Sequence, residues 1–292
     1  MHKKNQRFTV RIGLFETMIA SALFITSAAF AQPNPNSSTT NWVPILYWTN
    51  SIPDPSGDQQ ASGAELDIVG NQLEPSLYMQ YNSGYLGFRL RLGADTGQPG
   101  FQNCAFIGLD LNGTIDLFIG VDNQGSHDQL GIWFPGAGLN TSPSTTTIAN
   151  SPFLTYAETS ANYSFTAINA TIDPGATSFD LNGDGKTDQF LTFYVPFADV
   201  ASALATQNII FTTNSPMNLV AATSTQANTL NADLNGVTGG VSSSQTWAQL
   251  GANSLSYTPA GTAPVPEPVS GTLFSVLGGM TLLQLVVMRR RY

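Results

Sequence analysis

Nine residues in the second half of the chain combine acidic, amide and glycine residues at the spacing of a metal-binding loop. Calcium takes six to eight oxygen ligands, and side chains at loop positions 1, 3, 5 and 9, with a carbonyl at position 7, can surround one ion. These positions hold Asp180, Asn182, Asp184, Asp188 and the carbonyl of Lys186. Gly185 at position 6 permits the sharp turn. We therefore expect a calcium ion here, and a metal-free Asp/Asn/Gly turn is the alternative.

The run is similar to the calcium loops of EF-hands and dockerins, with two departures. Position 12, which holds a bidentate acid in a complete EF-hand loop, is Leu191. The flanking segments, Thr177–Leu181 and Gln189–Val195, have the composition of strands and not of helices. We expect a structural ion that ties a β-hairpin and binds more weakly than in an EF-hand.

Aromatic side chains offer a second kind of site, because flat rings stack on the apolar faces of sugars as they stack on each other. Trp48 and Trp133 are the candidates for such a platform. The alternative is that these rings fill the core of a protein whose single cysteine, Cys104, excludes an internal disulfide.

The elements that must position these residues are predicted to be short strands separated by Gly, Pro, Asn and Asp turns, which is typical of a β-sandwich. We predict an all-β, jelly-roll-like sandwich over residues 41–255, with one short helix at Phe197–Leu204. Residues 32–40 are expected to be a flexible lead-in and 256–265 a linker, and Ser215–Ser254 reads as loosely ordered sheet edge or loop. The expected strands are Pro44–Thr49, Glu65–Val69, Ser76–Tyr81, Tyr85–Leu92, Cys104–Leu109, Ile115–Val121, Gln129–Phe134, Phe153–Ala157, Tyr163–Ile168, Thr177–Leu181, Gln189–Val195 and Ile209–Thr213.

Two of these segments resemble part of a known fold. Glu65–Val69 followed by Tyr85–Arg91 is similar to the β-sandwich modules of carbohydrate-binding family 9 and the DOMON type. The resemblance implies a module that binds sugars.

The N-terminus has the order of a secretory signal peptide: basic residues, an apolar run from Met18 to Phe30, and Ala29-Phe30-Ala31. The apolar run is too short for a bilayer core of about 30 Å. We expect signal peptidase to remove residues 1–31, and an uncleaved anchor is the alternative.

The C-terminus has the composition of a membrane anchor. Val269–Met288 carries no charge and is 20 residues long, enough for a helix to cross a membrane. Arg289, Arg290 and Arg291 follow, and the positive-inside rule places them in the cytoplasm. Immediately before the helix, Pro266-Glu267-Pro268 keeps the chain extended.

This tail resembles the PEP-CTERM sorting domain, with tripeptide, helix and arginine cluster in the same order over residues 266–292. The resemblance implies processing by exosortase in a Gram-negative bacterium that makes exopolysaccharide, with transient anchoring in the inner membrane and then release or attachment at the cell surface. The alternative is an ordinary single-pass anchor.

Charge and composition exclude several functions. Between residues 32 and 268, three basic residues (Arg89, Arg91 and Lys186) stand against 18 acidic ones, a net charge near −15. Such a surface repels nucleic acid and favours cations. The same residues contain one histidine, His127, and offer no selectable carboxylate pair, which argues against an enzyme. We expect a non-enzymatic, calcium-stabilised surface protein associated with exopolysaccharide. A carbohydrate-binding module is the first alternative and a polysaccharide hydrolase the second.

Overall fold

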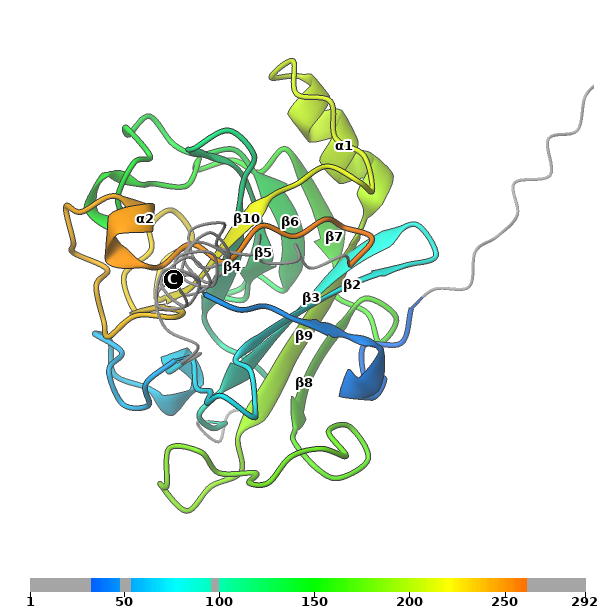
Figure 1. Ribbon diagram of the computed structural model, residues 1–292, viewed down its shortest axis with the longest axis vertical. Helices are drawn as coiled ribbons and strands as arrows, with labels where there is room; N and C mark the ends of the chain where they lie inside the picture. Colours follow the sequence, from blue (N-terminus) through cyan, green and yellow to red (C-terminus); the bar gives the residue numbers. More distant parts are fainter. Residues whose placement is uncertain (1–32, 48–53, 96–99, 262–292) are drawn as a thin grey trace, which may run out of the picture. The chain divides into compact units, whose positions relative to one another are not determined.

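The computed structural model describes residues 33–47, 54–95 and 100–261, and these form two antiparallel β-sheets with little helix. The sheets lie face to face around one hydrophobic core (Figure 1), which takes residues from both sheets, such as Phe88 of one and Ile119 of the other. The predicted all-β sandwich is confirmed. Its jelly-roll-like detail stays a prediction.

The first sheet has the order β1-β2-β3-β9-β8 and the second the order β11-β10-β4-β5-β6-β7. The four consecutive strands β4 to β7 form a meander, in which β4, β5 and β6 are joined by short loops and β6 and β7 by the longer segment that holds a 3-10 helix at Pro143–Thr145. The strands are β1 (Val43–Pro44), β2 (Leu77–Asn82), β3 (Tyr85–Leu92), β4 (Cys104–Asp110), β5 (Ile115–Asp122), β6 (Gln129–Trp133), β7 (Leu154–Ala157), β8 (Tyr163–Ala167), β9 (Gln189–Pro196), β10 (Asn218–Ser224) and β11 (Asp233–Leu234).

Strand β3 shows how alternation places charge on the outer face of a sheet. Leu86, Phe88 and Leu90 point into the core, whereas Arg89 and Arg91 point to the opposite face. Both arginine side chains are nevertheless fully buried, because loops and the N-terminal segment cover this face.

Helix α1 (Phe197–Ala205) confirms the predicted helix. It follows Pro196 and buries Val200, Ala203 and Leu204, which recur on one face. A second helix, α2 (Trp247–Leu250), was not predicted and is capped by Thr246, whose hydroxyl accepts from the amide of Gln249. Three short 3-10 helices complete the set: η1 (Thr39–Asn41), η2 (Ala64–Leu66) and η3 (Pro143–Thr145).

The region Ser215–Ser254 contains an interior strand, and our expectation of loose edge or loop was wrong there. Strand β10 pairs with β4 along its whole length and with β11 on its other side. Leu219 and Ala221 face the core between the sheets, whereas Val220 and Ala222 pack into a second cluster with Trp247. Because both faces are covered, the strand lacks the polar alternation that marks a half-buried strand.

Three expected strands are absent from the described residues. Glu65–Val69 begins in the 3-10 helix η2, and no regular strand forms at Thr177–Leu181 or Ile209–Thr213. Each segment is fixed instead by side chains or isolated bridges, as where Ile68 bridges to Leu92.

The expected lead-in and linker are tied to the sandwich. The guanidinium of Arg89 donates to the carbonyls of Pro35 and Ser37 at 2.7 and 2.9 Å, which holds the first described residues across the sheet. At the other end, Tyr257 is buried and bridges to Met217, and its hydroxyl oxygen accepts a hydrogen bond from the amide of Leu46 at 2.9 Å. Described residues beyond both limits of the predicted domain, 41 and 255, are therefore attached to the sandwich.

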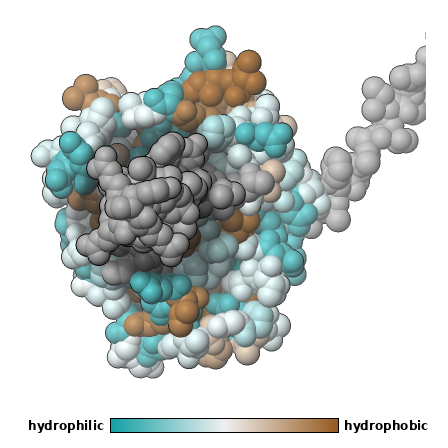
Figure 2. Space-filling model, viewed as in Figure 1, coloured by the Kyte–Doolittle hydropathy of each residue, from teal (hydrophilic) through white to brown (hydrophobic). Residues whose placement is uncertain are grey.

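On the face shown in Figure 2, hydrophobic residues form separate patches, one of them near helix α1. No helix in the described ranges is long and apolar enough to cross a membrane. Residues 262–292, with the predicted anchor, lie outside those ranges, as do residues 1–31 with the predicted signal peptide.

Candidate functional site: an acidic cluster and the Asp180 loop

Three aspartates from distant parts of the chain meet at one place, which we call the acidic cluster: Asp54, Asp58 and Asp233. One carboxylate oxygen from each lies within 4.8 Å of those of the other two. Asp54 and Asp233 are almost completely buried, at 1% and 0% exposure, and Asp58 is partly buried. Among the described residues, no other group of three His, Cys, Asp or Glu side chains meets this criterion. The acidic cluster could hold a metal ion.

Backbone amides orient each carboxylate of the acidic cluster. Asp54 accepts from the amide of Gly236 at 2.6 Å and Asp58 from that of Gly239 at 2.5 Å. Asp233 accepts from Ile68 and Leu234, both at 2.8 Å. These bonds fix the orientation of the carboxylates but do not neutralise their charge. The three carboxylates are therefore a prearranged set of oxygen ligands.

Two oxygens of the acidic cluster have no donor. Asp54 Oδ2 and Asp58 Oδ1 are buried and accept no hydrogen bond. The same is true of Oε1 of the adjacent Gln59. A buried acceptor without a partner is costly, by about 1–3 kcal/mol and more if it is charged. A hard cation bound here would supply the missing partner for such oxygens.

Burial, followed by repulsion between the carboxylates, raises the proton affinity of Asp54 and Asp233 in the acidic cluster. Burial, with added repulsion from Asp58, raises the pKa of Asp233 to about 8, and burial together with Asp233 and Asp58 raises the pKa of Asp54 well above its ordinary value. The basic side chains in the described ranges, Arg89, Arg91 and Lys186, form no ion pair with these carboxylates. A divalent cation would displace the protons and remove the repulsion.

The sequence carried a signal for the acidic cluster that we missed. Asp233 begins the tetrapeptide Asp-Leu-Asn-Gly, which also occurs at residues 110–113 and 180–183. In this copy Asn235 is buried and bonded to Tyr47, and Gly236 supplies the amide to Asp54. Asp54, which lies 179 residues away, is brought near by its bridge to Gly70 and by the pairing of β11 with β10. Only the tertiary structure joins the two segments.

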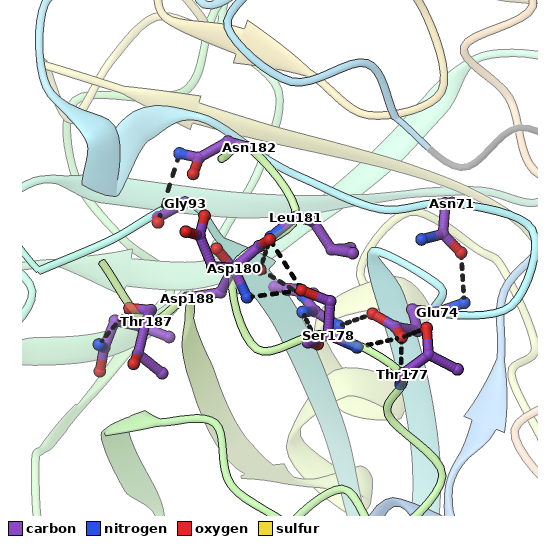
Figure 3. Close-up of polar contacts among 12 residues, drawn as sticks. Asn71, Glu74, Gly93, Thr177, Ser178, Asp180, Leu181, Asn182, Thr187 and Asp188 are labelled. Carbon is purple, nitrogen blue, oxygen red and sulfur yellow. Dashed lines mark hydrogen bonds and ion pairs between the residues drawn. The ribbon is translucent and has the colours of Figure 1, made fainter. Parts of the chain in front are cut away.

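The predicted calcium ligands at residues 180–188, which we call the Asp180 loop, adopt a turn in which side-chain oxygens accept hydrogen bonds from the loop's own amides. Figure 3 shows Asp180, Asn182 and Asp188 of this loop. Asp180 accepts from the amides of Gly183 at 2.7 Å and Gly185 at 2.9 Å, and both glycines have positive φ. Asn182 and Asp184 accept from amides two residues further on. The aspartates of the Asp180 loop do not close into a group like the acidic cluster, so its ligand oxygens are more widely spaced.

Asp188 anchors the Asp180 loop in the sandwich. Its Oδ2 accepts from Arg91 Nε at 2.8 Å and from the amide of Leu181 at 3.1 Å, whereas its Oδ1 is buried and without a partner. Arg91 also pairs with Glu74 at 2.8 Å, and Glu74 accepts from Thr177 and Ser178 (Figure 3). Burial raises the pKa of Asp188 even though Arg91 opposes that shift.

The other predicted site residues do not join either group. Trp133 is 2% exposed and its ring covers Gly131, so it cannot stack on a sugar, which corrects that expectation. The ring is buried because the glycine leaves space for it on the sheet face, against Phe106. Trp48 and the sorting residues Pro266, Glu267, Pro268, Arg289, Arg290 and Arg291 lie outside the described residues.

Comparisons of the chain with protein-family models, curated protein sequences and solved structures found no match.

Proposed function

We propose that this chain is an exported, exosortase-sorted protein of the cell surface or extracellular matrix, whose β-sandwich is non-enzymatic and stabilised by calcium. The acidic cluster is the observation that supports calcium, since it presents buried carboxylates with unpartnered oxygens and no compensating basic residue among those described. Calcium is the fitting ion because it accepts many oxygen ligands in flexible geometry.

The two terminal sequences support export and sorting. The N-terminal pattern of residues 1–31 sends the chain across the inner membrane, where signal peptidase removes it. The hydrophobic segment and Arg289–Arg291 then hold the C-terminus until exosortase acts near Pro266-Glu267-Pro268. The strongly acidic body suits an exopolysaccharide matrix rich in cations and does not suit nucleic acid. The buried Trp133 gives no support to the sugar-platform alternative.

Thermal unfolding of the full-length chain in detergent tests the calcium part of this proposal. An ion bound only to the folded state at 100 times its Kd adds about 2.7 kcal/mol, so EDTA should lower the Tm by about 5–10 °C and calcium should restore it. Asp54→Asn should abolish the difference, whereas Asp128→Asn, an exposed acidic residue outside the acidic cluster, should keep it. An identical Tm with EDTA and with millimolar calcium would reject calcium stabilisation.

Cell fractionation tests the sorting part. In a host with an exosortase, the mature protein should leave the inner membrane. Replacing Pro266, Glu267 and Pro268 by alanine should leave the chain in that membrane with its hydrophobic segment intact. Full-length protein in the soluble cytosolic fraction would contradict export.

A further inference from the structure

Asp67 lies between the acidic cluster and the Asp180 loop and contacts the surroundings of both. Its two carboxylate oxygens accept from the amide of Gly57, next to Asp58, at 2.9 and 3.0 Å. On its other side, Asp67 Oδ2 and Asn182 Nδ2 both reach the space beside Gly93, 3.4 and 2.6 Å from where a Cβ would stand. Gly93 is therefore the point at which the two acidic groups meet.

Hydrogen bonds connect the same three segments. The amide of Gly93 donates to the carbonyl of Asp67 at 2.9 Å, and Asn182 Nδ2 donates to the carbonyl of Gly93 at 3.4 Å. A shift of the Asp180 loop must therefore move Gly93 or break the hydrogen bond between Asn182 and Gly93. A shift of Gly93 in turn changes the hydrogen bond between its amide and the carbonyl of Asp67. This is a short and continuous path from one group of carboxylates to the other.

Each group also contains a fully buried oxygen without a partner. Asp54 Oδ2 belongs to the acidic cluster and Asp188 Oδ1 to the Asp180 loop, and their residues are 1% and 0% exposed. An ionised carboxylate is an acceptor only, so each oxygen requires a donor or a cation. Because these two oxygens belong to different groups of carboxylates, two ions would be needed to give each oxygen a partner.

The charges of the two groups act on Asp67 together. Asp58 of the acidic cluster and Asp188 of the Asp180 loop both raise the pKa of Asp67, in addition to the larger effect of burial. The physical link between the two groups is the series of hydrogen bonds from Gly57 to Asp67, from Asp67 to Gly93 and from Gly93 to Asn182.

We propose that the acidic cluster and the Asp180 loop bind one calcium ion each, and that Asp67 couples them so that the first ion promotes binding of the second. The inference rests on the calcium binding proposed above and extends it to a second, linked site. The acidic cluster already has its oxygens together and fills first. The ordering of Gly57, Asp67 and Gly93 by that ion reduces the entropy that closing the Asp180 loop must cost.

Calorimetric and dialysis titration of the calcium-stripped, full-length chain in detergent measures both the stoichiometry and the coupling. We expect two ions per chain with a Hill coefficient above 1. Asp67→Asn removes one of the two oxygens that accept from the amide of Gly57 and so loosens this link, and it should keep both ions while lowering the Hill coefficient to about 1. Asp128→Asn, an exposed substitution outside both groups, should behave as the unmodified chain.

Coupling is reciprocal, so single-site variants give a second and independent test. Asp54→Asn should leave one ion, bound at the Asp180 loop about fivefold or more weakly than in the unmodified chain. Asp184→Asn should leave one ion at the acidic cluster, weakened by the same factor. This test stands even if Asp67→Asn fails to fold.

The outcomes separate this inference from the proposed function. Two ions that bind independently, with affinities unchanged in the single-site variants, would reject the coupling and leave calcium stabilisation intact. A single ion lost with Asp54→Asn would reject the second site alone. No calcium bound at millimolar concentration would reject both.

Discussion

At the residue scale, Arg91 is the basic side chain that compensates buried acids in the sandwich. It is fully buried, pairs with Glu74 and Asp188 at 2.8 Å each, and donates to the carbonyl of Ser178. The sequence places Arg91 on the outer face of β3, because apolar and polar residues alternate along this strand. It did not predict that Arg89 would instead contact the rings of Trp42 and Phe190, because the covering segment comes from elsewhere in the chain.

Removing Arg91 should be severely destabilising, because it would leave two carboxylates buried without their partner. We expect Arg91→Leu to cost about 3–5 kcal/mol, measured by denaturant unfolding. Lys186→Leu, which removes an exposed charge, should change the free energy of unfolding by less than about 0.5 kcal/mol. Similar losses for both variants would contradict the assignment.

Glu158 should make stability depend on pH. Burial raises the pKa of its carboxyl to about 7 from 4.5, and Asp128 adds to the shift. Between these values the folded state binds more protons than the unfolded state, so the contribution to stability falls as pH rises through 7. Glu158→Gln should therefore raise the Tm at pH 8 by about 2 °C, a small effect because the group is partly exposed, and leave it unchanged at pH 4. An equal shift at both pH values would refute this.

At the scale of elements, glycines decide where aromatic rings lie on the sheets. The ring of Trp133 lies directly against Gly131 of β6, and the ring of Tyr194 lies directly against Gly87 of β3. Glycine in a strand often marks such a close approach. The sequence showed both the glycines and the rings, but the pairing of each ring with a particular glycine depends on register and on side-chain direction.

A methyl group at Gly131 should displace Trp133. A Cβ there would lie 2.5 Å from the ring, so Gly131→Ala should cost about 1–3 kcal/mol and change the near-ultraviolet circular dichroism of the tryptophan. Gly175→Ala is the control, because a Cβ at that exposed position meets nothing within 4 Å. Unchanged stability and spectrum in Gly131→Ala would argue that Trp133 lies elsewhere.

At the scale of the whole molecule, the folded unit extends beyond the segment predicted from turn residues and composition. Tyr257 is 1% exposed, forms a β-bridge with Met217, and accepts a hydrogen bond from the amide of Leu46 on its hydroxyl oxygen. The residues around it are Ser, Thr and Pro, which resemble a linker in composition. One buried aromatic residue is enough to dock such a segment.

Two truncated chains should distinguish a linker from a docked segment. Ending the chain after Leu255 removes Tyr257 and its bridge to Met217, whereas ending it after Gly261 keeps them. We expect the shorter chain to have a Tm lower by about 6 °C or more, since loss of a buried aromatic side chain costs about 3 kcal/mol or more. Equal melting temperatures would show that the predicted linker limit was correct.

The sequence by itself determined the β-rich class, the alternation of β3, helix α1, the acid excess and the two terminal patterns, because each depends on neighbouring residues or on composition. The tertiary structure decided that β10 is an interior strand, that Trp133 is buried and that Asp54, Asp58 and Asp233 form one group. The pairing of β10 with β4 and the acidic group depend on contacts between segments more than 100 residues apart, such as Gly236 with Asp54, and the burial of Trp133 depends on how its ring lies on the sheet. Local sequence patterns do not predict such contacts, because the same short pattern is compatible with a solvated turn and with a buried metal ligand.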